Sequence, residues 1–153
     1  MIKINIVAVG KVKEKFFRDA IDEYLKRSGK YAEVSVIEAP EGVDEGDSVR
    51  LARAESDGII KRLKGFVVLL DLKGKAISSE EIASLIQERS VAGVSEFTFV
   101  IGGSRGVSQE VKDKADVMIN FGKVTYPHQL MRVIVSEQIY RALTIINKAS
   151  YHK

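Results

Sequence analysis

Hydrophobic residues in this chain fall into two alternating kinds of run. Five runs are short and almost continuously apolar, which is typical of strands buried on both faces of a parallel sheet. The segments between them carry apolar residues at helical spacing. This alternation predicts an α/β domain with a mostly parallel sheet and helices on both faces. The predicted strands cover residues 2–10, 33–39, 66–72, 96–102 and 116–121.

Sequence signals mark several helix ends. Gly29 follows an apolar stripe that runs from Phe16 to Leu25 and is a stop signal. Ser78 and Glu81 have the spacing of a capping box. Further helices are expected over residues 47–64, over 108–115 with the serine at 108 as its cap, and from about residue 127 to 147.

The last of these helices is unusually apolar. One stripe along it and a second set of apolar residues together exceed the face that a surface helix normally buries. Such a helix is expected either in the centre of the core or in a subunit interface. The stripe is Met131, Val135, Ile139, Leu143 and Ile146, and the widening residues are Leu130, Val133, Ile134 and Ala142.

Composition excludes several functional classes. A chain of 153 residues suits a single domain, residues 1–153. The absence of cysteine excludes thiolate chemistry, and two histidines argue against a metal centre. No apolar run approaches the ~20 residues of a membrane span, and the N-terminal stretch is a poor signal peptide, so we expect a cytoplasmic protein. The net charge of +3 permits a phosphate-rich partner without requiring one.

Ligands of parallel α/β sheets bind at the carboxyl ends of strands, which directs attention to residues 71–76, 102–107 and 121–128. In the first segment, Gly74 suggests a turn and the flanking lysines suggest nothing more. In the second, IGGSRGVS, the glycines permit close approach of a ligand. Their spacing does not match G-x-G-x-x-G, however, and a turn without a ligand is about equally consistent with it.

The third segment, VTYPHQ, leads into the apolar helix. Thr125 is a candidate cap, and Pro127 suits the first helical turn. His128 is then expected near the strand ends, where a neutral imidazole can accept a proton. From these residues alone, a plain capping loop with a surface histidine is the slightly favoured interpretation. The ordinary interpretation of Arg132 and Arg141 is that they pair with Glu137, but Arg132 lies one turn beyond His128 and could instead reach the same ligand.

These segments together resemble one family. VIGGSRGVS, FGKVTYPHQLMRVIVSEQIYRA, the terminal YHK and the opening IVAVGKVKEKFFRDAIDEYLKR are similar to the ribosomal RNA large subunit methyltransferase H family, one of the SPOUT methyltransferases. The resemblance covers the whole chain. It implies a C-terminal trefoil knot, which no periodicity argument predicts. It also implies a homodimer that uses S-adenosylmethionine to methylate N3 of a pseudouridine in 23S rRNA within an assembled ribosome.

The resemblance also implies roles for individual residues. His128 would be the first candidate for the base that accepts the proton, and His152 the second. Tyr151 would orient or stack on the target, and Arg132 would contact phosphate or base oxygens. The alternative is a ribosome-binding protein that keeps the fold without catalysis. The residues implied to contact the cofactor are Leu70, Gly102, Phe121, Gly122, Lys123, Val124, Thr125 and Tyr126.

Overall fold

The computed structural model describes residues 1–42 and 47–153 and has a central sheet of five parallel strands. The strand order is β2-β1-β4-β3-β5. The predicted strands and the parallel sheet are confirmed, although the ends of four strands differ from the prediction by one to four residues. The strands are β1 (Lys3–Val9), β2 (Glu33–Ala39), β3 (Phe66–Ala76), β4 (Glu96–Ile101) and β5 (Val117–Asn120).

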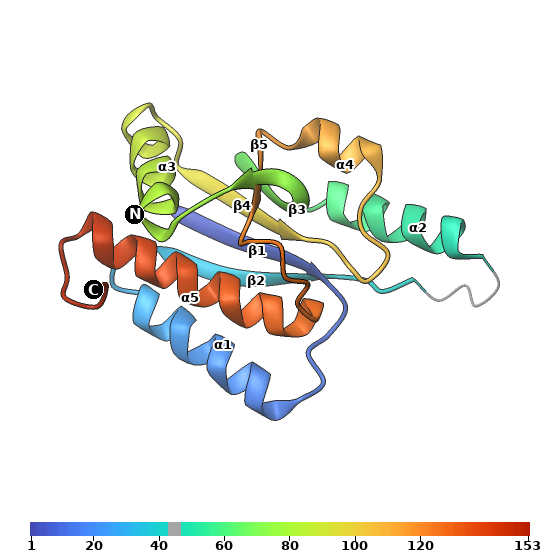
Figure 1. The fold of residues 1–153 in the computed structure, drawn as a ribbon, viewed down its shortest axis with the longest axis horizontal. Coiled ribbons are helices and arrows are strands. Elements are labelled where there is room, and N and C mark those ends of the chain that lie inside the picture. Colours follow the sequence, from blue (N-terminus) through green and yellow to red (C-terminus); the bar gives the residue numbers. More distant parts are fainter. Residues whose placement is uncertain (43–46) are drawn as a thin grey trace.

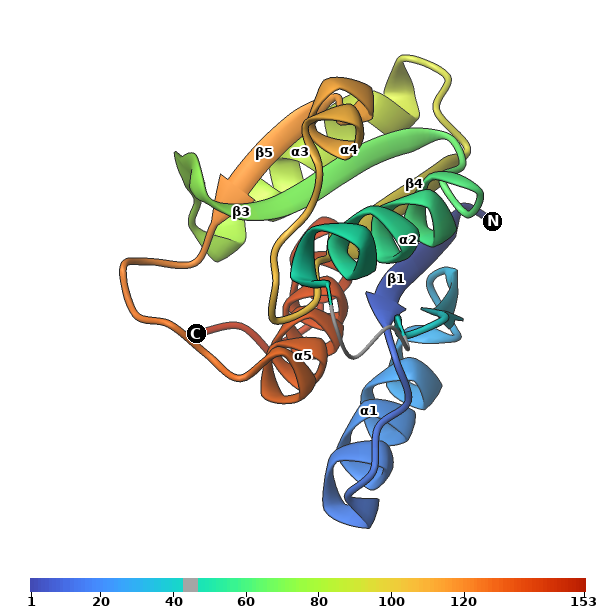
Figure 2. The same cartoon turned by 90° about the vertical axis from the view of Figure 1, so that its right-hand side faces the viewer.

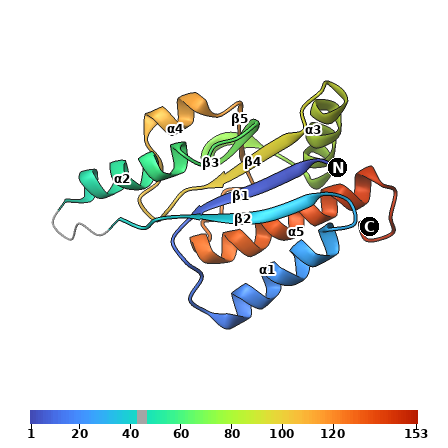
Figure 3. The same cartoon turned by 180° about the vertical axis from the view of Figure 1, so that it is seen from behind.

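Helices cover both faces of this sheet. Figures 1 and 2 show α1, α3 and α5 over one face and α2 and α4 over the other. Seen from behind in Figure 3, α5 runs along the sheet next to α1, and it also packs against α3. The helices are α1 (Lys15–Ser28), α2 (Ser48–Ile60), α3 (Ser79–Val91), α4 (Gln109–Lys114) and α5 (His128–Ile146).

Each face of the sheet has its own apolar core, because alternate residues of a strand point to opposite faces. In β1, Ile4 and Ile6 belong to the core under α3 and α5, whereas Val7 and Val9 belong to the core under α2 and α4. All four are at most 5% exposed. Full burial of a side chain of this size stabilises the fold by roughly 1.5–3 kcal/mol. Burial on both faces explains why the strand runs are continuously apolar.

Helix α5 contributes most of its predicted stripe to the first of these cores. The central residues of the stripe are buried there, and Ala142 is buried with them. The other three widening residues are partly exposed and belong to neither core. The expectation that this helix lies in the centre of the core is therefore confirmed, whereas a subunit interface on its other apolar residues stays a prediction. These three are Leu130, Val133 and Ile134.

Strand β3 is longer than predicted, and the turn expected at Gly74 is wrong. Gly74 lies inside β3, where the pairing with β5 shifts register between Leu70 and Lys75. A Cβ added to Gly74 would lie 2.6 Å from the backbone nitrogen of Ile119. The glycine is therefore required by the close approach of two strands, which the local sequence does not distinguish from a turn.

The predicted helix ends are confirmed for α1, α3 and α4. Helix α1 ends at Ser28, directly before Gly29. The capping box forms, since Ser78 Oγ accepts from the Glu81 N–H at 3.1 Å and Glu81 Oε1 accepts from the Ser78 N–H at 3.0 Å. Ser108 caps α4 by accepting from the N–H of residue 111 at 3.3 Å.

Two helix ends differ from the prediction. Helix α2 is capped by Asp47, as its predicted start suggests, but ends at Ile60, before the predicted residue 64. Helix α5 begins at His128 with Pro127 in the cap position and no capping side chain, so the predicted cap by Thr125 is wrong. Thr125 lies two residues before the cap, because Pro127 takes an extended ψ of 138° and delays the start of the helix.

Candidate functional site

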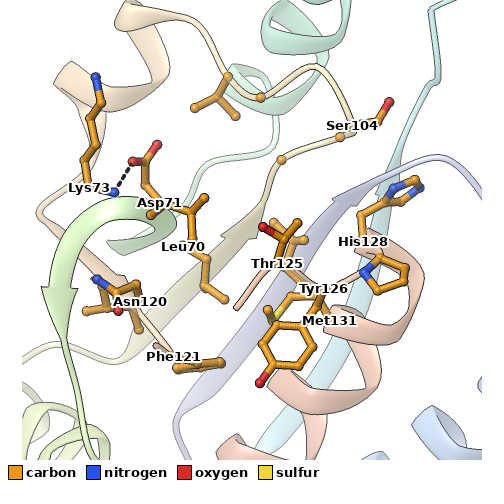
Figure 4. A pocket seen from close by; sticks show the side chains of 18 of the residues that line it. Leu70, Asp71, Lys73, Ser104, Asn120, Phe121, Thr125, Tyr126, His128 and Met131 are labelled. Carbon is orange, nitrogen blue, oxygen red and sulfur yellow. Dashed lines mark hydrogen bonds between the residues drawn. The ribbon is translucent and has the colours of Figure 1, made fainter. Parts of the chain in front are cut away.

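A cavity of about 570 Å³ opens at the carboxyl edge of the sheet, where β3, β4 and β5 end. Three segments far apart in the sequence line it: the end of β3, the loop after β4, and the stretch from β5 into α5 (Figure 4). Its volume falls within the roughly 300–1,000 Å³ range of small-molecule sites. Its walls are mainly apolar, with side chains such as Leu70, Ile101, Phe121 and Met131.

Seven of the eight residues that the family resemblance assigned to a cofactor line this cavity. Lys123 is the exception, since it is exposed and is not among the lining residues. The structure thus brings the three predicted loops together, whereas their contact with a ligand stays a prediction. The seven are Leu70, Gly102, Phe121, Gly122, Val124, Thr125 and Tyr126.

The loop after β4 is shaped by its glycines. Gly103 and Gly106 form an isolated antiparallel bridge, and Gly106 has a φ of +75°, which a side chain would strain. A Cβ added to Gly102 would lie 2.9 Å from Val107 Cγ1. The loop therefore presents backbone to the cavity, and a side chain at these positions would distort it.

Helix α2 supports the same loop from behind. Ser56, which is 1% exposed, accepts a hydrogen bond from the Ser108 N–H at 3.0 Å. Glu55 is 3% exposed and accepts from the Gly42 N–H at 3.1 Å, and its other oxygen would lie 3.2 Å from a Cβ added to Gly103. Sequence patterns gave no hint of these two buried polar residues, because both lie on a helix with ordinary amphipathic spacing.

Asn120 joins two walls of the cavity and was missed by the sequence analysis. Its side-chain amide donates to the carbonyl of Gly74 in β3. Its carbonyl oxygen accepts from the N–H of Gly122 at 3.0 Å, where Gly122 has a φ of +111°. One side chain therefore fixes both the end of β3 and the start of the segment that leads to α5. An asparagine at the end of a predicted strand was the only available clue.

A second polar group borders the cavity at the end of β3. The carboxylate of Asp71 accepts from the N–H of Lys73 at 2.9 Å and lies 3.9 Å from the Lys112 ammonium. The first contact is drawn in Figure 4. Among the described residues that line the cavity, Asp71 is the only one with a carboxylate, and it gives the β3 side an acceptor for cationic or N–H groups of a ligand.

His128 lines the cavity on the side away from Asp71 and Lys73 (Figure 4). It is the first residue of α5 and is half-buried. Its ring can therefore contact both a ligand inside the cavity and a molecule that covers the opening.

Arg132 is not brought to this cavity, although it lies one turn beyond His128. Its side chain is 1% exposed and turns toward the ends of β1 and β2. Its Nη1 lies 2.8 Å from Glu38 Oε2, and its Nη2 donates to the carbonyls of Val9 and Gly10 at 3.2 and 3.1 Å. The buried guanidinium thus ties α5 to the strand ends.

The predicted partner of Arg132 is also corrected by the structure. The predicted pairing of Glu137 is confirmed for Arg141, whose Nη2 lies 2.6 Å from Glu137 Oε1, and is wrong for Arg132, which pairs with Glu38. The reason is geometric, because Arg132 lies on the face of α5 that is buried against the sheet, whereas Glu137 and Arg141 lie on a partly exposed face.

The C-terminal tail folds back on α3 and α5 of its own chain. The Tyr151 hydroxyl donates to Glu137 Oε1 at 3.2 Å, and its ring lies 4.7 Å from the ring of Tyr140. His152 places Nδ1 at 3.1 Å from Arg141 Nη1 and Nε2 at 2.6 Å from an oxygen of Glu80. The tail is thus ordered by hydrogen bonds from both of its predicted functional residues.

The tail and the cavity lie at opposite ends of α5. Figures 1 and 3 agree that α5 runs from near the middle of the molecule to the end at which the C-terminus lies. Along a helix that rises about 1.5 Å per residue, His128 and Arg141 are separated by roughly 20 Å. Within one protomer, therefore, Tyr151 and His152 do not meet His128.

Burial changes the acid–base behaviour of Tyr151. Desolvation, reinforced by the negative charge of Glu137, raises the pKa of the Tyr151 hydroxyl to about 12. The hydroxyl is therefore neutral under physiological conditions. It can donate a hydrogen bond or stack, but it is not a candidate for the base.

Sequence comparison identifies the family. A model described as "Predicted SPOUT methyltransferase" matches residues 2–152. "Ribosomal RNA large subunit methyltransferase H" of Carboxydothermus hydrogenoformans is 48% identical, covering 99% of this chain and 100% of its own. "Putative ribosomal RNA large subunit methyltransferase H" of Methanococcus maripaludis is 43% identical with the same coverage. The chain belongs to this family of SPOUT methyltransferases.

Solved structures agree with this family in fold. A probable methyltransferase from Bordetella pertussis Tohama I has a TM-score of 0.59 and 13% identity, covering 92% of this chain and 93% of its own. A probable methylase family protein from Haemophilus influenzae Rd KW20 has a TM-score of 0.56 and 18% identity, covering 98% and 70%. At such low identity these two structures support the fold alone.

Residues 1–42 and 47–153 contain no helix that is long and apolar enough to cross a membrane. The same described residues hold no cluster of three histidine, aspartate or glutamate side chains suited to a metal ion.

Proposed function

We propose that this SPOUT methyltransferase transfers a methyl group from S-adenosylmethionine to N3 of one pseudouridine in 23S rRNA, within an assembled ribosome in the cytoplasm. The whole chain would act as one domain. The observation that carries the proposal is the cavity, which gathers seven of the eight residues expected from the family's cofactor loops. Full-length relatives with ribosomal RNA methyltransferase names support it.

The residues around the cavity fit S-adenosylmethionine. Apolar side chains such as Leu70 and Phe121 suit its adenine ring, and Gly102 lets the loop beside it pack closely, because a Cβ there would press on Val107. The carboxylate of Asp71 suits its cationic and N–H groups. When bound, the cofactor supplies an electrophilic methyl group on a sulfonium, so the protein has mainly to align donor and acceptor.

His128 is the candidate for removing the proton from the target nitrogen. Methylation at N3 requires that this nitrogen lose its proton, and a nearby imidazole can accept it. His128 lies at the rim of the cavity and is half-buried, so a target base at the opening would come within its reach. Arg132, in contrast, would act indirectly, by holding the first turn of α5 on the sheet.

We also propose that the active unit is a homodimer whose partner subunit supplies the tail. Tyr151 and His152 lie too far from the cavity of their own chain to complete it. The apolar residues of α5 outside both cores, Leu130, Val133 and Ile134, offer a surface for a second copy. A symmetric dimer contains two such shared sites.

The trefoil knot belongs to the same proposal. Family membership supports it, as does the close approach of β3 and β5 at Gly74, where their parallel pairing shifts register. From β5, at one edge of the sheet, the chain crosses to the core face under β1 and β4 as α5. Such a crossing is what threading of the C-terminal segment requires.

The deciding experiment is methyl transfer from radiolabelled S-adenosylmethionine to ribosomes that lack this modification. The wild-type protein should label a single pseudouridine. His128→Ala should reduce the rate by about 10²–10⁴-fold while binding of S-adenosylmethionine, measured by calorimetry, stays unchanged. Ribosome binding without label would instead favour a non-catalytic ribosome-binding protein. Cofactor binding without ribosome labelling would direct the search to another substrate.

A further inference from the structure

The segment that joins β1 to α1, residues 10–18, lies beside the start of α5. The N–H of Lys13 points to Gln129 Oε1 at 3.4 Å, and Gln129 directly follows His128. The segment leaves β1 at the same carboxyl edge of the sheet at which the cavity opens. A molecule that covers the cavity mouth on the His128 side would therefore also approach this segment.

Three contacts hold the backbone of this segment in place. Val12 is 8% exposed and anchors the loop in the interior. Arg18, one turn into α1, donates from Nη1 to the carbonyls of Val12 and Lys13, each at 3.0 Å. Because Val12 is buried between them, Lys11 and Lys13 are both exposed. The lysines thus stand on a fixed backbone, which reduces the entropy lost when a ligand binds.

The same segment concentrates positive charge. It contains Lys11, Lys13, Lys15 and Arg18 but only one carboxylate, Glu14, so it carries as much net charge as the entire chain, +3. Lys15 pairs with Asp19 at 2.7 Å, but both side chains are more than half exposed, so that pair is weak.

An exposed aromatic ring lies among these charges. Phe16 is 65% exposed and is supported by Phe17, whose ring centroid is 4.5 Å away. An exposed phenyl group of this kind is costly in water and is suited to stacking on a flat ligand. Lysines beside a stacking ring are the combination with which proteins hold single-stranded RNA, through phosphates and an unstacked base.

We propose that Lys11, Lys13, Lys15 and Phe16 form an RNA-binding surface that holds the nucleotides next to the target base. The lysines contact phosphates, and Phe16 stacks on a base that is not paired. This inference rests on the proposed function, because it takes the RNA substrate from it. It adds a surface that fixes the RNA from outside the cavity.

Binding of unmodified ribosomes, measured directly, tests this surface independently of methyl transfer. The variant Lys11→Ala/Lys13→Ala is compared with Lys61→Ala/Lys64→Ala, which removes two exposed lysines at the opposite edge of the sheet. We expect the first pair of substitutions to weaken ribosome binding about tenfold. The slope of log Kd against log salt concentration should also fall by about one to two, because each lost phosphate contact lowers it by roughly 0.7–0.9. The control pair should bind like wild type, and S-adenosylmethionine binding should be unchanged in both.

The aromatic part has its own pair of variants. Phe16→Leu keeps an apolar side chain but removes the ring, and it should weaken ribosome binding by about five- to a hundredfold, the range for loss of one stacked base. Val91→Ala is the control, since Val91 is 85% exposed at the far end of α3.

Several results would overturn the proposal. It fails if all four variants bind ribosomes equally. It also fails if Lys61→Ala/Lys64→Ala loses as much affinity as Lys11→Ala/Lys13→Ala. Loss of binding that accompanies dissociation in the ultracentrifuge would assign the surface to a second copy of the chain. A wild-type protein that does not bind ribosomes would refute it as well. If the wild type binds but does not methylate, only the proposed reaction fails, and the binding comparison still decides the surface.

Discussion

The two ends of α5 are built in different ways. At its start, backbone segments and apolar side chains enclose an open cavity, in which the His128 side chain makes no hydrogen bond or ion pair with the residues that the structure describes. At its end, Glu137, Arg141, Tyr151 and His152 contact one another and reach Glu80 on α3. The first arrangement leaves open space, and an imidazole free to bond to a ligand. The second is already satisfied, so a substrate must compete with the contacts of the tail.

The residues that the sequence grouped as catalytic therefore lie in different parts of one protomer. His128 borders the cavity, Arg132 is buried beside the strand ends, and the two tail residues lie about 20 Å from the first. A single protomer cannot combine them. Either the site is shared between two subunits, or the tail does not take part in the reaction.

Mixed dimers would distinguish these possibilities and should give the largest effect. His128→Ala and His152→Ala are each expected to lose about 10²–10⁴-fold of methyl transfer. A heterodimer that carries one of each, isolated through two different tags, should regain activity because one of its two shared sites is intact. A two-tag dimer with His128→Ala in both subunits is the control and should stay inactive. Without any recovery in the mixed dimer, a shared site is ruled out.

Replacing Arg132 tests whether it acts in the reaction or in the fold. Arg132→Met leaves the carbonyls of Val9 and Gly10 without their charged donor and Glu38, whose side chain is 40% exposed, without its partner, so we expect the free energy of unfolding to fall by about 3 kcal/mol. Urea denaturation measures this change. Arg62→Met, which loses one hydrogen bond from a partly exposed arginine to Gly58, should cost about 1 kcal/mol. If Arg132→Met lost activity without losing stability, Arg132 would be assigned a contact with the substrate.

Removing the Asn120 side chain should affect the cavity end of α5 alone. Asn120→Ala loses its bonds to Gly74 and Gly122, each worth about 1 kcal/mol. The Kd for S-adenosylmethionine should therefore rise by about five- to thirtyfold. The control is Asn147→Ala, which loses a bond to the Leu143 carbonyl at the other end of the helix. Equal cofactor affinities in both variants would show that the cavity does not need the Asn120 bonds to Gly74 and Gly122.

The smallest expected effect is the response of the tail to acid. The hydrogen bond with His152 is the main cause that holds the pKa of the Glu80 carboxyl below its usual value. Folding thus favours the carboxylate, and the stabilisation of the docked tail is present above the usual pKa and is lost as the pH falls through the lowered one. The ring resonances of Tyr151 in NMR should shift in that range. In Glu80→Gln they should not, and a shift that persists there would point to another titrating group.

Local patterns were sufficient to predict much of this molecule. Continuous apolar runs located the strands, and Ser78 with Glu81 located a helix start, because these features depend on residues close together in the chain. The cavity loops could be predicted because carboxyl ends of parallel strands share one edge.

Features that depend on strand order could not be predicted in the same way. Gly74 has the appearance of a turn residue until β5 is known to pass against it. The hydrogen bond from Asn120 to Gly74 joins the ends of two strands that are neighbours only because of the order β3-β5. Arg132 could be placed on a helix, but its contact with Glu38 spans 94 residues of sequence.

The strand order also bears on how this protein avoids aggregation. Parallel sheets leave two open edges, which can pair with other chains in crowded solutions. Here one edge strand, β5, has only four residues. The other, β2, carries the exposed carboxylate of Glu33, which repels a second copy of the same strand. A short edge strand and a charged edge strand together disfavour edge-to-edge pairing of one sheet with the next.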